Sequence, residues 1–302
     1  QNENFLASDA MSLAGVTDQI VYLEEGDVVD LQLGKYWVVD KAHKPVTRTV
    51  KTVQAHSGAA ELGPYRHYMQ KEIFEQPRAT ADTLEGVVGI TPELFGDGAF
   101  SVFKEIDSVL ILACGTSYYS GCTAKYWLES IAGIPTSVEI ASEYRYRESV
   151  PNPNTLVVTI SQSGETADTL VAIENAKQKG AVILGVVNVV GSSIARTSHG
   201  GAYTHAGPEI GVASTKAFTG QLAVLTMVAL KVGKEKGTLS EERYSQLLFE
   251  LEAVPEKVEA LLKSADAIKA IAEKYKGSSD ALFLGRGYNF PIALEGALKL
   301  KE

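Results

Sequence analysis

The chain has 302 residues, of which 45% are hydrophobic and 22% charged, and 28 lysine and arginine residues against 37 aspartate and glutamate residues give a formal net charge of −9. This composition is typical of globular proteins and excludes disordered, collagen-like and coiled-coil chains, and at roughly 150 residues per domain the length predicts about two domains. The acidic balance disfavours nucleic acid as a partner, because no stripe of lysine and arginine is present to neutralise phosphates.

The first 50 residues predict a β-rich segment. Three short strands are expected, at 19–23, 28–33 and 36–40. Gly26 and Gly34 suit the turns between them. A polar stretch with glycine and proline breakers follows and is typical of a linker. We therefore expect a β-rich part at 1–48 and a linker at 49–71.

From residue 72 the pattern changes to alternating strands and helices. Apolar, β-branched runs predict five strands, at 109–113, 136–140, 156–160, 182–187 and 203–206. Helical patterns lie at 121–132, 168–178 and 215–231. This alternation predicts an α/β domain over 72–238, with a doubly wound parallel sheet that is covered on both faces.

Residues 239–302 predict two connecting helices, at 241–262 and 264–276, and then the start of a second α/β unit. A strand that breaks at Gly115 into a helix has an echo around Gly287, which suggests a duplicated unit. Any two strand-to-helix turns share some of this pattern, so chance similarity stays open. The chain begins without methionine and ends in an amphipathic run, 291–302, without a stop signal, so we expect a piece of a longer protein.

Hydroxyl-bearing side chains follow two neighbouring predicted strands. One turn holds Ser161, Gln162, Ser163 and Thr166, and the other holds Gly115, Thr116 and Ser117. Because helix N-termini with hydroxyls at the carboxyl ends of parallel strands bind phosphate, the two turns predict a pocket for a small phosphorylated ligand. Helix capping would explain Ser163 or Thr166 alone, but the number of hydroxyls favours the pocket. The first turn lacks the lysine of a Walker A loop, and Phe290 stands where a Rossmann fingerprint requires glycine or alanine.

Longer motifs resemble the glutamine:fructose-6-phosphate amidotransferase family. They lie at 65–77, 113–117, 161–170, 209–219 and 293–302. Segments 4–9 and 22–27 also resemble the end of that family's glutaminase domain, so the resemblance covers almost the whole chain. It implies the end of an N-terminal-nucleophile glutaminase domain, a first sugar isomerase (SIS) domain of flavodoxin-like fold, and the truncated start of a second SIS domain.

The resemblance also implies a reaction. A glutaminase releases ammonia from glutamine, the ammonia replaces the C2 carbonyl oxygen of fructose 6-phosphate, and a 1,2 proton shift gives glucosamine 6-phosphate. No metal and no organic cofactor is implied. A homodimer is implied, because the family's active site borrows a histidine from a neighbouring subunit.

By motif position, the resemblance assigns roles to single residues. The phosphate falls to Ser161, Gln162, Ser163 and Thr166, with Gly115, Thr116 and Ser117 nearby, and the sugar falls to Val212 and Ser214. Glu302 aligns with the proton-shuttling carboxylate and Lys299 with a lysine beside it. Glu295, Lys299 and Glu302 share one helix face, where an ammonium can keep a carboxylate ionised. Without the resemblance, an exposed salt-bridged face would be the simpler interpretation.

Two departures from the family lead us to expect that this chain alone binds sugar phosphate weakly and does not turn over. Gln1 is not the family's N-terminal cysteine, and the rest of the second SIS domain is absent from the sequence. An alternative hypothesis is a non-catalytic SIS module that senses a sugar phosphate. It requires only the two hydroxyl turns and leaves Glu302 and the glutaminase-like segments unexplained.

The sequence also predicts no membrane segment, disulfide or metal site. The longest apolar stretches, 181–190 and 222–232, fall short of the roughly 20 residues that span a bilayer, and the first ten residues lack a signal pattern. Cys114 and Cys122 are the only cysteines, and we expect both to be small buried residues. The five histidines lack zinc-ligand spacing. We therefore expect a cytoplasmic protein.

Overall fold

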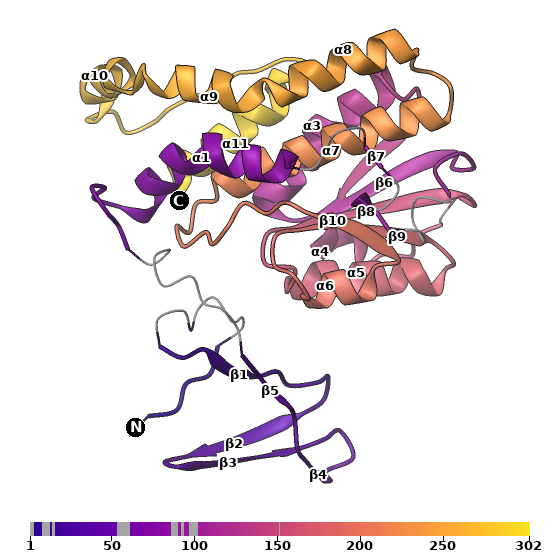
Figure 1. Ribbon diagram of the computed structural model, residues 1–302, viewed down its shortest axis with the longest axis vertical. Coiled ribbons are helices and arrows are strands. Elements are labelled where there is room, and N and C mark those ends of the chain that lie inside the picture. Colours follow the sequence, from indigo (N-terminus) through magenta and orange to yellow (C-terminus); the bar gives the residue numbers. More distant parts are fainter. Residues whose placement is uncertain are drawn as a thin grey trace. The chain divides into compact units, whose positions relative to one another are not determined.

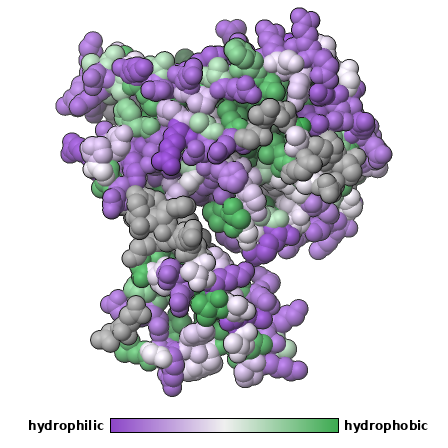
Figure 2. Space-filling model, viewed as in Figure 1, coloured by the Kyte–Doolittle hydropathy of each residue, from purple (hydrophilic) through white to green (hydrophobic). Residues whose placement is uncertain are grey.

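The computed structural model describes residues 3–7, 13, 16–52, 61–85, 90–91, 94–96, 102–150 and 152–302. The chain divides into two compact units, Gln1–Pro64 (unit 1) and Tyr65–Glu302 (unit 2) (Figure 1). Hydrophilic side chains cover much of the visible surface of each unit (Figure 2). Among the described residues, no helix combines the length and apolar character needed to cross a membrane. The limits 1–48, 49–71, 72–238 and 239–302 stay predictions of domain organisation.

Unit 1 contains two small antiparallel sheets. They are β1 (Gln19–Val21) with β5 (Val50–Thr52), and β2 (Val28–Gln32), β3 (Lys35–Val39) and β4 (Pro45–Val46) in that order. Gly34 makes the tight turn between β2 and β3 with a φ of +77°, a left-handed conformation that suits glycine. The expected β-rich character of this part of the chain is confirmed. β4 and β5 were not predicted, because they are only 2 and 3 residues long.

The core of unit 2 is a five-stranded parallel sheet with the strand order β10-β9-β8-β6-β7. Its strands are β6 (Ser108–Ala113), β7 (Thr136–Ile140), β8 (Thr155–Ser161), β9 (Val182–Val187) and β10 (Gly200–Tyr203). The central strand β8 is buried from Leu156 onward, which is why its sequence is almost continuously apolar. The predicted parallel α/β sheet is confirmed, and β6 to β9 match the predicted runs to within a residue at either end.

The fifth strand lies earlier in the chain than predicted. β10 covers 200–203, whereas the apolar pattern favoured 203–206. Two glycines hide the strand, because glycine has no side chain to contribute β propensity. A Cβ at Gly201 would overlap the carbonyl oxygen of Gly185 on β9, so the close approach of the two strands requires glycine there.

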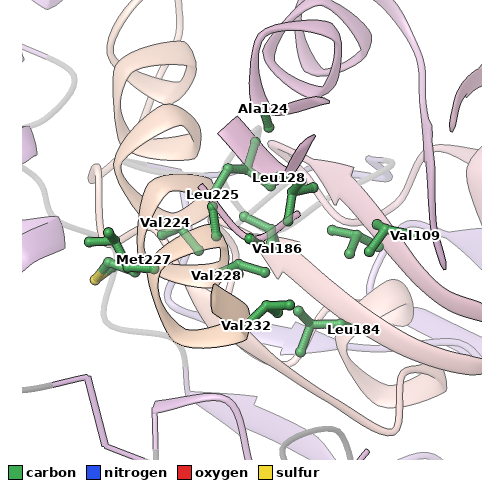
Figure 3. Close-up of a cluster of buried hydrophobic side chains, with 14 of the residues drawn as sticks. Val109, Ala124, Leu128, Leu184, Val186, Val224, Leu225, Met227, Val228 and Val232 are labelled. Carbon is green, nitrogen blue, oxygen red and sulfur yellow. The ribbon is translucent and has the colours of Figure 1, made fainter. Parts of the chain in front are cut away.

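Helices cover both faces of the sheet (Figure 1). One face carries α3 (Gly115–Ser130) and α7 (Lys216–Glu235), with α1 (Tyr68–Leu84) packed on α7; the other carries α4 (Ala141–Tyr144), α5 (Ala167–Gln178) and α6 (Ser193–Thr197). Leu225 and Val228 of α7 pack with Leu128 of α3 and Val186 of β9 in one buried cluster (Figure 3). Burying a side chain of this size contributes roughly 1.5–3 kcal/mol, so the cluster holds both helices to the sheet.

Three helices differ from the predicted ranges. α1 was not predicted, and it begins inside the expected linker. The predicted helix 241–262 is divided into α8 (Glu241–Glu252) and α9 (Val254–Leu262), because Pro255 has no N–H for a continuous helix. α3 begins at Gly115 instead of residue 121. This earlier start places the whole turn 115–117 at a helix N-terminus.

Helices α10 (Ala265–Tyr275) and α11 (Asn289–Lys301) follow, and α11 packs against α3. The rings of Tyr126 and Tyr288 lie 5.2 Å apart in this contact. The expected echo of strand, glycine turn and helix forms only in part. Gly287 has a φ of +58° and α11 follows it, but no described strand pairs with residues 281–286. A strand requires a hydrogen-bonding partner, so this segment is not part of a described sheet.

Candidate functional site

A cleft of 330 Å³ opens at the carboxyl ends of β6 and β8. In the chain β6 is followed by β7, which lies on one side of it, and then by β8, which lies on its other side. The cleft therefore lies where the strand order reverses, the usual ligand position in open α/β sheets. Of the predicted site residues, the cleft is lined by Gly115, Thr116, Ser117, Ser161, Gln162, Ser163, Thr166, Val212, Ser214 and Glu302. The remaining one, Lys299, lies behind Thr116, with Nζ 3.0 Å from Oγ1.

The turn that follows β8 is held by its own hydroxyl groups. Ser161 Oγ accepts the N–H of Gly164 at 3.0 Å, and Ser163 Oγ accepts the N–H of Glu165 at 3.2 Å. Thr166 precedes α5 but makes no side-chain cap bond to it. Thr166 therefore leaves the first-turn N–H groups of α5 uncapped, and such groups can bind an anion. Helix capping does not explain Thr166, and Ser163 braces the turn instead of the helix.

Glycine is required at position 164 for two reasons. Its φ is +67°, in the left-handed region, and a Cβ there would overlap Oγ of Ser192. The turn 161–166 is thus pressed against the start of α6, where Glu165 also accepts the N–H of Ser193 at 2.8 Å.

The turn that follows β6 is supported from below by a buried polar network. Gln221, only 1% exposed on α7, donates to Ser117 Oγ at 3.0 Å and accepts from Ser120 Oγ at 3.0 Å. Because Ser117 Oγ accepts this bond, its own hydrogen is free to donate toward the cleft. Neither Gln221 nor Ser120 was among the predicted site residues. The available signal was a glutamine at the edge of a long apolar helix.

Removing the amide of Gln221 would take away the donor to the buried hydroxyl of Ser117, while Ser120 Oγ would keep its bond to the carbonyl oxygen of Ser117 at 2.8 Å. We expect Gln221→Leu to lower the free energy of unfolding by about 1–3 kcal/mol, since a buried unsatisfied polar group costs that much. Urea denaturation of the chain measures this loss. The matched change Gln246→Leu, on α8 and outside this network, should be near neutral, and equal losses in both variants would contradict the network's importance.

The third wall of the cleft is the loop before α7. Glu209 caps α7, because its carboxylate accepts the N–H of Thr215 at 2.7 Å and of Ala217 at 3.3 Å and also the hydroxyl of Ser214. From α1, Glu72 accepts the N–H of Ile210 at 2.5 Å. Neither Glu72 nor Glu209 was among the predicted site residues. Glu72 lies 138 residues from its partner Ile210. Glu209 lies only 6 residues from Thr215, but their contact depends on how the loop folds.

Helix α11 brings a charged group to the cleft. Lys299 Nζ lies 3.2 Å from Glu295 Oε1 and 3.8 Å from Glu302 Oε2, so the three residues share one face as predicted. Thr116 Oγ1 accepts from Lys299 and donates to Glu295 at 3.1 Å. Burial raises the pKa of the Glu295 carboxyl, an effect that the Lys299 charge opposes. The cleft is thus lined by two hydroxyl turns at helix N-termini and by Glu302, and Lys299 lies behind Thr116 between the carboxylates of Glu295 and Glu302.

Other predicted features are outside this arrangement. Cys114 and Cys122 are each partly exposed instead of fully buried, Cys114 in the lining of the cleft, and burial raises the pKa of the Cys122 thiol. Among the described residues, no cluster of three metal-ligating side chains is present. A second cleft, of 370 Å³, lies at the amino ends of β8 and β9, and none of the predicted residues lines it.

Comparison with known proteins agrees with this fold. Residues 103–231 match the SIS domain family, which places unit 2 among the SIS-domain proteins. The chain is 63% identical over 303 residues to the glutamine–fructose-6-phosphate aminotransferase (isomerizing) of Bordetella pertussis and 50% identical over 306 residues to that of Xanthomonas campestris, and covers 50% of each. A solved C-terminal domain of the Francisella tularensis enzyme superposes with a TM-score of 0.78 at 44% identity, over 80% of this chain and 69% of that one.

The chain belongs to the glutamine–fructose-6-phosphate aminotransferase family. It spans about half the length of the curated relatives that it matches.

Proposed function

We propose that the protein converts fructose 6-phosphate and glutamine to glucosamine 6-phosphate and glutamate, and that this chain supplies the sugar-phosphate-binding part. The observation that carries the proposal is the composition of the cleft, which joins two hydroxyl-rich turns at helix N-termini to Glu302 and Lys299 of α11. The names of the relatives point to the same reaction.

The phosphate group would lie at the N-termini of α3 and α5. The lining residues there are hydroxyl and amide donors, with no lysine or arginine among the residues described as lining the cleft. Backbone N–H groups and the positive ends of two helix dipoles suit a phosphate dianion without a paired cation. Ser117, Gln162, Ser163 and Thr166 would supply the remaining donors, and Val212 and Ser214 would contact the sugar.

Glu302 would carry the proton between C1 and C2 once ammonia has replaced the C2 oxygen. A carboxylate serves this role if one oxygen can reach both carbons in turn and if it is ionised before the transfer. Lys299 Nζ lies 3.8 Å from Glu302 Oε2 and places a positive charge beside it. The ammonia would come from glutamine in the glutaminase part, in a cytoplasmic homodimer, and we expect these 302 residues alone not to turn over.

A non-catalytic SIS module that senses a sugar phosphate is the alternative. It would need the two hydroxyl turns but no acid–base group facing them. Glu302 in the cleft lining and its lysine neighbour favour the enzyme.

The binding half of the proposal is tested by titrating the chain with fructose 6-phosphate, fructose and inorganic phosphate in a calorimeter. We expect fructose 6-phosphate to bind more tightly than inorganic phosphate, because it adds sugar contacts, and fructose not to bind measurably. Equal binding of fructose and fructose 6-phosphate would contradict a phosphate site at the two turns.

A further inference from the structure

A buried carboxylate on α1, that of Glu72, accepts hydrogen bonds from the backbone of the loop that forms one wall of the cleft. Glu72 is 2% exposed, and its carboxylate accepts the backbone N–H of Ile210 at 2.5 Å and of Gly211 at 3.0 Å. The partners are 138 and 139 residues apart in the chain. A charged acceptor makes roughly twice as strong a bond to an N–H as a neutral one, so this contact fixes the backbone of the loop.

The loop is also shaped to receive this carboxylate. A Cβ at Gly211 would lie 2.5 Å from Glu72 Oε2 and 3.2 Å from the backbone nitrogen of Met69. A side chain at position 211 would therefore have to displace the Glu72 carboxylate or move the loop away from α1. The position of the Glu72 carboxylate on α1 and the absence of a side chain at Gly211 in the loop thus fit together.

The loop that Glu72 holds forms part of the cleft lining. Gly211, Val212 and Ser214 face the cleft. Val212 is 90% exposed, so its own packing does not hold it in place. Its position depends on the backbone bonds at 210 and 211, while Ser214 is held separately by Glu209.

The surroundings of Glu72 change the pKa of its carboxyl in both directions, with a net rise. Burial raises the pKa of its carboxyl, the N–H bonds from Gly211 and Ile210 lower it, Glu209 raises it and Lys216 lowers it. Lys216 is itself paired with Glu75 at 2.7 Å. The two N–H bonds are thus the main local compensation for burying this acid.

We propose that Glu72 is a positioning residue for sugar recognition, which holds the loop 210–212 so that Val212 meets the sugar of the bound sugar phosphate. The inference rests on the proposed function for its ligand. It adds a role for α1, which contributes no side chain to the described lining of the cleft.

The variant Glu72→Gln tests this role in the 302-residue chain. It keeps the size of the side chain and one oxygen that can accept both N–H groups, but it removes the charge and puts an NH₂ group, which cannot accept, in place of Oε2, which lies 3.2 Å from the Gly211 nitrogen. We expect the Kd for fructose 6-phosphate to rise about tenfold, because both bonds to the loop become neutral and weaker, while the Kd for inorganic phosphate at the turns 115–117 and 161–166 stays unchanged. Calorimetry and phosphorus NMR measure the two ligands.

A matched control separates positioning from a general loss of stability. Thr83 is also buried on α1, and its hydroxyl donates to the carbonyl oxygens of Ala79 and Thr204, away from the cleft. Thr83→Val should lower stability and leave both Kd values unchanged. Glu72→Asp keeps the charge with a shorter reach and gives a second measurement if the glutamine variant fails to fold.

Amide hydrogen exchange gives a readout that needs no ligand. We expect faster exchange at Ile210 and Gly211 in Glu72→Gln and not in Thr83→Val. Unchanged exchange, or an unchanged ratio of the two Kd values, would overturn the role of Glu72. If the unmodified chain binds inorganic phosphate but gains nothing from the sugar, the proposed function fails instead, and the exchange result still decides the grip on the loop.

Discussion

Glu302→Gln is expected to lower kcat of the whole protein by about 10²–10⁴-fold with little change in KM for fructose 6-phosphate, the usual contribution of a positioned acid–base group. Glutamine has the size and polarity of glutamate but cannot take up and release the proton. Glu302 lines the cleft from the end of α11 and belongs to neither hydroxyl turn, so its loss should spare the phosphate contacts. Steady-state assays of glucosamine 6-phosphate formation measure both constants.

The matched control is Glu259→Gln, the same change at an exposed position on α9. It should leave kcat and KM as they are. If Glu302→Gln retains full turnover, or if it raises KM and leaves kcat unchanged, Glu302 contributes to binding and the proton transfer must be assigned to another group. Glu295, which lies against the same lysine, would then be the next residue to test.

Gly164→Ala is expected to weaken fructose 6-phosphate binding by at least about tenfold and to destabilise unit 2. The left-handed φ of +67° costs an alanine roughly 1–2 kcal/mol, and the new methyl group must also displace Ser192. If instead the turn 161–166 moves away from Ser192, the bond from Gly164 N–H to Ser161 Oγ is strained and the hydroxyls that face the cleft change position. Because a phosphate site depends on hydrogen-bond distances, a shift of this kind weakens binding.

Gly180→Ala separates the two costs. Gly180 has a φ of +88°, also left-handed, but among the described residues no atom beyond its two chain neighbours lies within 4 Å of the position that its Cβ would occupy. It should lose stability only through the backbone term, roughly 1–2 kcal/mol, with binding unchanged. Calorimetry for the Kd and urea denaturation for stability compare the pair, and equal Kd values in the two variants would contradict the importance of the turn 161–166.

The sequence predicts the parts of the site that are continuous in the chain. A buried strand followed by Ser161 to Thr166 and then by a helical pattern is enough to indicate a hydroxyl turn at the carboxyl end of a strand, and the structure has that turn. The second turn, at 115–117, was predicted for the same reason. Its position in the first turn of α3 was not predicted, because the start of that helix was placed too late in the chain.

The sequence does not predict contacts that cross the fold. Glu72 meets Ile210 only because α1 packs on α7, and no local pattern of charge or hydropathy encodes that meeting. Gln221 interrupts the apolar character of its helix, a sign that a buried polar partner exists, but the partner Ser117 lies 104 residues away. Gly201 was missed because its value to β10 is the absence of a side chain.

We propose that fructose 6-phosphate binds with its phosphate between the two hydroxyl turns and its C1 and C2 atoms toward Glu302. A crystal structure of the chain with fructose 6-phosphate tests this arrangement. We expect phosphate oxygens within hydrogen-bond distance of the N-termini of α3 and α5, with Glu302 on the side of C1 and C2. A phosphate bound in the second cleft, at the amino ends of β8 and β9, would contradict it.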